Sequence, residues 1–206
     1  MSDAPPDDDW HFGLELPEGW VTAQLDLPDD ERRDALRDDI DQLVADEPGL
    51  RHDVDRMKVV AVDMSDYAVE HDAMASAVGF DLVDGAAVAM AISLHRLDAD
   101  GEVDLDALAE TMAVPDEFDV NPRDVEVVDL PAGPSVRIHT ITEAGPTSDA
   151  AGVPVVERVD YLIPVPGRAE LLYVTCSTPS VAVGDLIVPA FDAMAETVTI
   201  DVPGAQ

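Results

Sequence analysis

Few residues of this chain could do chemistry, and their spacing matches no catalytic motif. The sequence contains no G-x-S-x-G, no P-loop, no H-E-x-x-H and no C-x-x-C. Residues 98–104 resemble a calcium-binding loop, but Val103 occupies the sixth position, counted from Asp98, where an EF-hand needs glycine. We therefore predict an acidic turn before a helix with Asp104 near its N-cap, and no metal or other cofactor.

The histidines are scattered, and no two of them lie four residues apart on a predicted helix. They are His11, His52, His71, His95 and His139. We interpret them as surface or packed side chains rather than metal ligands. Arg137 and His139 share one face of a predicted strand, opposite Val136 and Ile138. That face could line a shallow polar groove or form a partly exposed sheet edge, and we favour the second interpretation.

Cys176 is the only cysteine, so no intrachain disulfide can form, as is typical of a reducing compartment. It lies in the middle of a predicted strand, where a thiol should be buried and unreactive. The hydroxyls of residues 177–180 have no base near them in the sequence. Carboxylate pairs cannot be singled out among 45 acidic residues. We therefore predict no catalytic residue and a protein that is not an enzyme.

The formal net charge is −34, and Lys58 is the only lysine. Arg32, Arg33 and Arg37 are embedded among aspartates and a glutamate, so no basic patch is left for phosphate. This composition argues against binding of nucleic acid or an anionic membrane. The acidic surface could attract a basic protein partner or mimic a nucleic acid. It could also be a solvated surface that is adapted to high salt, or one whose lysines were replaced because the genome has a high GC content. We favour this interpretation of a solvated surface.

The first half of the chain predicts an acidic disordered tail, a hairpin and two helices. The tail is 1–9, and the hairpin strands are 10–16 and 20–27. The first helix should begin with Asp29 or Asp30 as its N-cap and end at Pro48-Gly49. The second covers 50–64, although its middle, 59–62, could be a short strand instead.

A second hairpin is the clearest local signal. Asp84-Gly85 is a two-residue turn between strands 77–83 and 86–96, and it pairs Leu82 with Ala87 and Phe80 with Ala89. Both faces of this hairpin are apolar, so helices should cover both faces of the sheet.

The second half predicts a helix from Asp104 to Pro115, four strands and a closing helix at 185–198. The strands are 125–130, 135–142, 155–163 and 170–177. The last of these is apolar on both faces and should be central. The predicted fold is α+β, an antiparallel sheet of about six to eight strands flanked by helices. It should form one domain, 10–200, with a loose C-terminus at 201–206. Residues 1–9 do not form a signal peptide and no apolar run could cross a bilayer, so we expect a cytoplasmic protein.

Several segments, taken in order, resemble the PsbP-like superfamily across roughly 12–200. The opening hairpin motif is similar to Phe12-Gly-Leu-Glu-Leu-Pro17-Glu-Gly19-Trp20, and a later hairpin motif to Asp129-Leu-Pro-Ala-Gly-Pro-Ser-Val-Arg137. The closing strands and helix resemble residues 161–164, 171–179 and 191–198. The superfamily includes the photosystem oxygen-evolving subunit and a nuclear Ran-binding protein. The resemblance implies an antiparallel sheet between helices and a non-catalytic adaptor or assembly role.

Three functions follow from these observations. The first is a non-catalytic binding or accessory protein with an unidentified protein partner, itself a monomer or weak oligomer. The second is a small-ligand-binding protein or an enzyme with a pocket that the sequence does not reveal. The third is an acidic decoy for a basic partner. Partner-binding residues cannot be named from the sequence.

Overall fold

The computed structural model describes residues 10–99, 101–143 and 155–203, and the predicted tail 1–9 lies outside them. The helices are α1 (Asp29–Asp46), η1 (Pro48–Asp53), α2 (Val54–Glu70), α3 (Leu105–Met112), η3 (Val181–Val183) and α4 (Gly184–Ala195). The strands are β1 (His11–Gly13), β2 (Trp20–Thr22), β3 (Ala75–Val83), β4 (Ala86–Asp98), β5 (Asp124–Leu130), β6 (Gly133–Glu143), β7 (Val155–Pro164), β8 (Glu170–Thr178) and β9 (Thr199–Asp201).

Seven strands form one antiparallel sheet in the order β2-β3-β4-β8-β7-β6-β5. The strand that is apolar on both faces, β8, is its fourth and central member, as predicted. The hairpin of β3 and β4 has the predicted register, with Leu82 opposite Ala87 and Phe80 opposite Ala89. Asp84 and Gly85 at its tip both have positive φ, as a two-residue turn of this kind requires.

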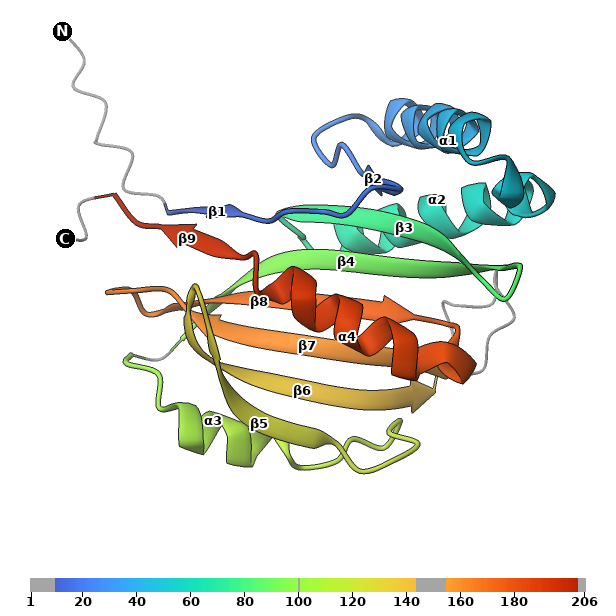
Figure 1. Ribbon diagram of the computed structural model, residues 1–206. Coiled ribbons are helices and arrows are strands. Elements are labelled where there is room, and N and C mark those ends of the chain that lie inside the picture. Colours follow the sequence, from blue (N-terminus) through green and yellow to red (C-terminus); the bar gives the residue numbers. More distant parts are fainter. Residues whose placement is uncertain (1–9, 100, 144–154, 204–206) are drawn as a thin grey trace, which may run out of the picture.

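Helices cover both faces of the sheet, so the predicted α+β fold is confirmed (Figure 1). α4 packs on one face, where it contacts β7 and β8. α2 packs on β3 and β4 of the other face with α1 beside it, and α3 packs there on β5 and β6. Alternate residues of β8 therefore enter different cores: Leu172 and Val174 lie beneath α4, and Tyr173 packs on the α3 side.

The predicted hairpin between 10–16 and 20–27 is wrong. β1 pairs with β9 at the other end of the chain, and β2 pairs with β3. The segment between β1 and β2 therefore connects two different sheets. Gly19 in this segment has a φ of +87°, which glycine adopts readily. Asp201 belongs to β9, so pairing extends one residue into the predicted loose C-terminus.

Among the α-helices that the structure describes, only α3 has a side-chain N-cap. Asp104 caps α3, accepting hydrogen bonds from the amides of Asp106 and Ala107 at 3.1 Å each. α1 begins differently from prediction: Pro28 is its N-cap and no side chain caps it, so Asp29 and Asp30 lie in the first turn. Acidic residues there still favour the helix, because its N-terminus carries partial positive charge. The alternative strand at 59–62 is helix. None of the helices that the structure describes is long and apolar enough to span a bilayer.

Candidate functional site

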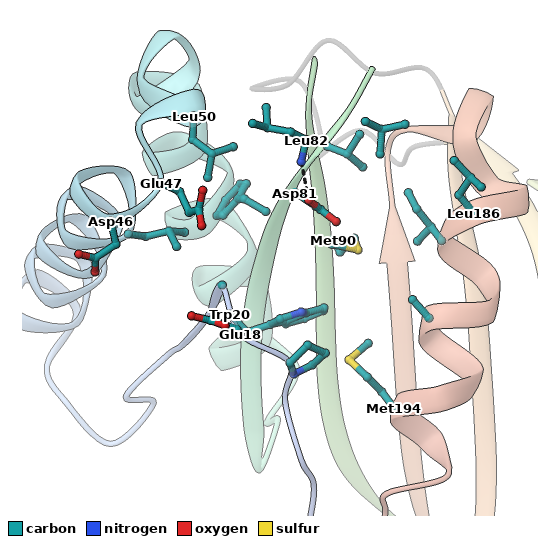
Figure 2. A pocket seen from close by; sticks show the side chains of 18 residues that line it. Glu18, Trp20, Asp46, Glu47, Leu50, Asp81, Leu82, Met90, Leu186 and Met194 are labelled. Atoms are coloured by element: carbon teal, nitrogen blue, oxygen red, sulfur yellow. Dashed lines mark hydrogen bonds between the residues drawn. The ribbon is translucent and has the colours of Figure 1, made fainter. Parts of the chain in front are cut away.

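A cleft of about 500 Å³ opens at the outer edge of β3, between α1 and η1 on one side and α4 on the other (Figure 2). Eighteen residues from both halves of the chain line it, among them Glu18, Trp20, Leu82, Met90 and Leu186. A volume of this size is in the range of known ligand sites.

Trp20 lies between the two helical walls of the cleft (Figure 2). Its side chain is only partly buried and packs against the α4-side core. The indole can come this close to β3 because its neighbour there is Gly79, where any Cβ would overlap the ring. Trp20 is thus a wall of the cleft rather than a core residue.

The α4 side of the cleft is apolar. Met90 of β4 and Met194 of α4 face it, together with Leu186, which is 64% exposed (Figure 2). A leucine this exposed on the helix that covers the main core contributes little to folding. The exposed side chain of Leu186 instead provides apolar surface that a ligand or partner could contact.

The opposite wall is also apolar and belongs to the other core. It consists of Leu43, Leu50 and Phe80 of that core, and the exposed Leu82 of β3 completes it. Side chains of β3 alternate between the two faces of the sheet, and residues of both faces line the cleft. The cleft therefore follows the edge of the sheet from one helical layer to the other.

The remaining polar lining is acidic. Glu18, Asp46, Glu47 and Asp81 stand around the cleft, and all four are exposed (Figure 2). Within the described chain none of them forms an ion pair, and the lining contains no Lys, Arg or His. Asp46 and Glu47 also stand at the C-terminal end of α1, where the helix dipole is negative and acidic residues are unfavourable. These positions create a negative potential at the mouth of an apolar cleft.

A second polar cluster lies on the sheet face that α2 and α3 cover. Arg158 donates hydrogen bonds to Asp160 at 3.1 Å and to the Tyr173 hydroxyl at 2.7 Å. Burial opposes the charge of Arg158, but the neighbouring Asp160 raises the pKa of the guanidinium overall. Burial also raises the pKa of Tyr173. Because its charges are matched internally, this cluster offers no free charge to a ligand.

Ser93 and His95 of β4 form a pair that resembles a nucleophile and its base. Ser93 Oγ lies 2.9 Å from His95 Nε2, and His95 Nδ1 lies 3.2 Å from the carbonyl oxygen of His71. Both side chains are buried, and burial lowers the pKa of His95. Because both side chains are at most 9% exposed, we interpret the pair as structural.

Carboxylates occupy the strand face of Arg137 and His139, for which the sequence left a polar groove or, as favoured, a partly exposed edge. Arg137 binds Asp192 of α4 at 2.8 Å and Glu126 at 3.3 Å, and Tyr161 donates a hydrogen bond to Asp192. Arg137 is itself buried, so neither the open groove nor an exposed edge describes it. These contacts of Arg137 and Tyr161 with Asp192 link α4 to the sheet.

His139 lies 2.8 Å from Oε1 of Glu157, whose other oxygen is buried without a hydrogen-bond partner among the described residues. The first residue of α4, Gly184, passes so close that a Cβ there would overlap the Glu157 carboxylate. The positive end of α4 thus faces this carboxylate and stabilises it.

The other candidate residues of the sequence have structural roles. Arg32 and Arg33 both bind Asp66 at 2.8 Å, and Arg37 binds Asp34. Cys176 is fully buried, and burial raises the pKa of its thiol. Within the described ranges, no group of three or more His, Cys, Asp or Glu side chains is arranged to hold a metal.

The comparisons with known proteins leave the function open. The sequence matches no protein-family model and no curated protein. One solved structure with a similar arrangement is LpqN of Mycobacterium tuberculosis, described as involved in cell envelope biogenesis, at 12% identity and a TM-score of 0.49. The match covers 97% of this chain and 87% of LpqN. So distant a likeness carries no function across.

Proposed function

We propose that this chain is a non-catalytic binding protein and that the cleft at the β3 edge receives a basic segment of a protein partner. The observation that carries the proposal is the apolar cleft with four acidic side chains around it, none of which forms an ion pair with another described residue. Apolar side chains of the partner would fill the space between Trp20, Met90 and Leu50. Its lysines or arginines would face the acidic rim.

The charge distribution favours this partner over an acidic one. Several basic residues elsewhere in the fold are bound to carboxylates, as with Arg32, Arg137 and Arg158. The rim carboxylates lack such partners, so a basic segment would relieve their mutual repulsion. An adaptor role also agrees with the PsbP-like resemblance of the sequence, and a cytoplasmic location stays part of the proposal.

The test is direct binding of a designed peptide by fluorescence anisotropy. The probe is a capped, labelled octapeptide with two lysines at each end and four apolar β-branched residues between them. We expect it to bind, and a peptide with glutamate in place of lysine to bind at least about tenfold more weakly at low salt.

Two variants with equal changes in net charge identify the site. Asp46→Asn, Glu47→Gln and Asp81→Asn together remove charge from the rim. Asp106→Asn, Glu110→Gln and Glu117→Gln remove as much charge from exposed positions on or near α3. The rim variant should weaken binding about tenfold, since exposed ion pairs contribute up to about 1 kcal/mol each. Equal affinity in both variants, or no binding to the unmodified protein, would refute the proposed function.

A small cationic amphiphile is the second candidate, because the cleft volume also fits a compact ligand. An amphiphile that binds the unmodified protein while the octapeptide does not would favour it.

A further inference from the structure

The edge strand β5 lies at the opposite end of the sheet from the cleft (Figure 1). It pairs with β6 on one side, and the sheet order places no described strand on its other side. α3 contacts β5 and β6 from one face of the sheet, where it packs near Val125. The seven residues of β5 therefore present about 23 Å of strand edge.

Hydrogen bonds just before β5 show which of its backbone groups point outward. The amide of Val120 donates to the carbonyl oxygen of Ile141, and the amide of Glu143 donates to that of Phe118, both at 2.8 Å. Odd-numbered backbone groups of β6 therefore face β5, and the uninterrupted register of β6 with β7 maintains this alternation. Even-numbered residues of β5 lie opposite them. The outward-facing residues of β5 are thus the odd-numbered ones, Val125, Val127 and Asp129.

The side chains along this edge are acidic and apolar. Their order along β5 is acid, apolar, acid, apolar, apolar, acid, apolar. Asp124 and Asp129 are exposed and form no ion pair with another described residue, and Glu126 binds Arg137 at 3.3 Å. Val127 is 45% exposed. A strand added here would therefore meet carboxylates at three positions and apolar side chains at the others.

A basic partner fits this edge better than a second copy of the chain does. Two copies would bring together two net charges of −34, and β5 itself contains no cation to offset them. Lysines or arginines opposite the acids, with apolar residues opposite the valines, would instead form favourable cross-strand pairs. The outward backbone groups of an edge strand are a template for such pairing.

We propose that β5 accepts an extended segment of a protein partner as an additional strand, with basic side chains opposite Asp124, Glu126 and Asp129. Backbone pairing would supply affinity, and the order of basic and apolar residues in the segment would supply specificity. This surface is separate from the cleft, so the inference goes beyond the proposed function and does not rest on it.

Two heptapeptides of equal composition test the order of side chains by fluorescence anisotropy. The aligned peptide is Val-Lys-Val-Val-Lys-Val-Lys, which places a lysine opposite each acid when it pairs antiparallel to β5. The block peptide is Val-Val-Lys-Lys-Lys-Val-Val, which matches only one acid in either direction. The aligned peptide should bind at least about fivefold more tightly at low salt. Equal affinity of the two peptides would overturn the proposal.

Two protein variants of equal charge locate the aligned peptide. Asp124→Asn with Asp129→Asn should weaken its binding at least about fivefold, because two cross-strand charge pairs are lost. Asp46→Asn with Asp81→Asn removes as much charge from the rim of the cleft and should leave its affinity nearly unchanged. Equal weakening in both variants would show that the peptide responds only to net charge, and would overturn the proposal.

Amide hydrogen exchange, read residue by residue by NMR, tests the backbone pairing. In the free protein, the outward amides of Val125, Val127 and Asp129 should exchange quickly, and those of Glu126 and Val128 slowly. Saturating aligned peptide should slow the outward amides at least about tenfold. Slow exchange of these amides in the free protein, or no change when the peptide binds, would overturn strand addition.

Sedimentation equilibrium of the free protein tests the alternative occupant. We expect a monomer at about 0.1 M and about 1 M potassium chloride, since the higher concentration screens the repulsion that opposes self-association. Val127→Pro removes an outward amide and keeps the ladder to β6, because proline is tolerated at strand edges. A dimer that this substitution abolishes would assign the edge to a second copy and overturn the proposal.

Discussion

Trp20 and Gly79 fit together so closely that any side chain at position 79 would overlap the indole. The two residues face each other across the ladder between β2 and β3. This contact gives the indole its position in the cleft.

Gly79→Ala should destabilise the fold by about 1–3 kcal/mol, because the new methyl group displaces Trp20. The same substitution in a Trp20→Ala background should be neutral or stabilising by up to about 1 kcal/mol, since alanine suits a strand better than glycine. Urea unfolding of the four proteins measures both values. An equal cost in both backgrounds would show that Trp20 does not depend on Gly79.

The closing helix provides a comparison of a buried and an exposed residue. Phe191 of α4 is fully buried, and Leu186 of the same helix faces the cleft. Phe191→Ala should cost about 3–5 kcal/mol through lost burial and a cavity. Leu186→Ala should cost less than about 0.5 kcal/mol and weaken peptide binding. A small loss for Phe191→Ala, under about 1 kcal/mol, would mean that α4 does not dock as described.

The thiol of Cys176 should react with a labelling reagent only when the chain opens. Burial raises its pKa, so little thiolate forms at pH 8. Labelling should be at least about 10³-fold slower in buffer than in denaturant, as expected for exposure through global unfolding. A cysteine introduced at the exposed Glu196, in a Cys176→Ala background, should react equally fast in both. Fast labelling of native Cys176 would remove it from the core.

Asp63 and Asp66 of α2 are shifted in opposite directions. Burial and the charge of Asp66 raise the pKa of Asp63. For Asp66, burial opposes ionisation, but hydrogen bonds from Arg33 and Arg32 lower its pKa overall. The ionised Asp66 therefore stabilises the fold above its ordinary pKa of about 4, and this stability is lost as the pH falls through its lowered pKa. The ionised Asp63 destabilises the fold above its raised pKa.

Asparagine substitutions separate these two effects. At pH 7, Asp66→Asn should cost roughly 1–3 kcal/mol, because Arg32 and Arg33 lose a charged partner. Asp63→Asn should be neutral or slightly stabilising, within about 0.5 kcal/mol. Both differences should shrink at about pH 3, where the carboxyl groups of the unfolded chain are protonated. Destabilisation of similar size by both substitutions would contradict the assigned ion pairs.

Local signals in the sequence predicted most elements of the fold. Asp84-Gly85 specified its turn and register because two-residue loops permit few geometries, and Asp104 specified the start of α3. The pairing of β1 with β9 could not be predicted in this way. His11 meets Asp201 across nearly the whole chain, and alternation shows that a strand exists without naming its partner.

The cleft could not be predicted for a related reason. Glu18, Asp46 and Asp81 come from separate parts of the chain, and each looks like an ordinary surface residue among the 45 acidic residues of the sequence. Trp20 had the alternation of a core residue, and only the position of Gly79 beneath it shows that its ring lines a cleft. The structural pair of Ser93 and His95 could not be predicted either, because two strand residues on one face do not form a recognisable motif.

Amide hydrogen exchange along the whole chain, with and without saturating octapeptide, tests the cleft most directly. If the peptide binds in the cleft, protection should increase around Leu82 and in the backbone around Trp20, Glu47 and Leu186. Exchange near Arg158, on the sheet face that α2 and α3 cover, should stay unchanged. Unchanged exchange from Phe80 to Val83 together with new protection around Arg158 would contradict the account.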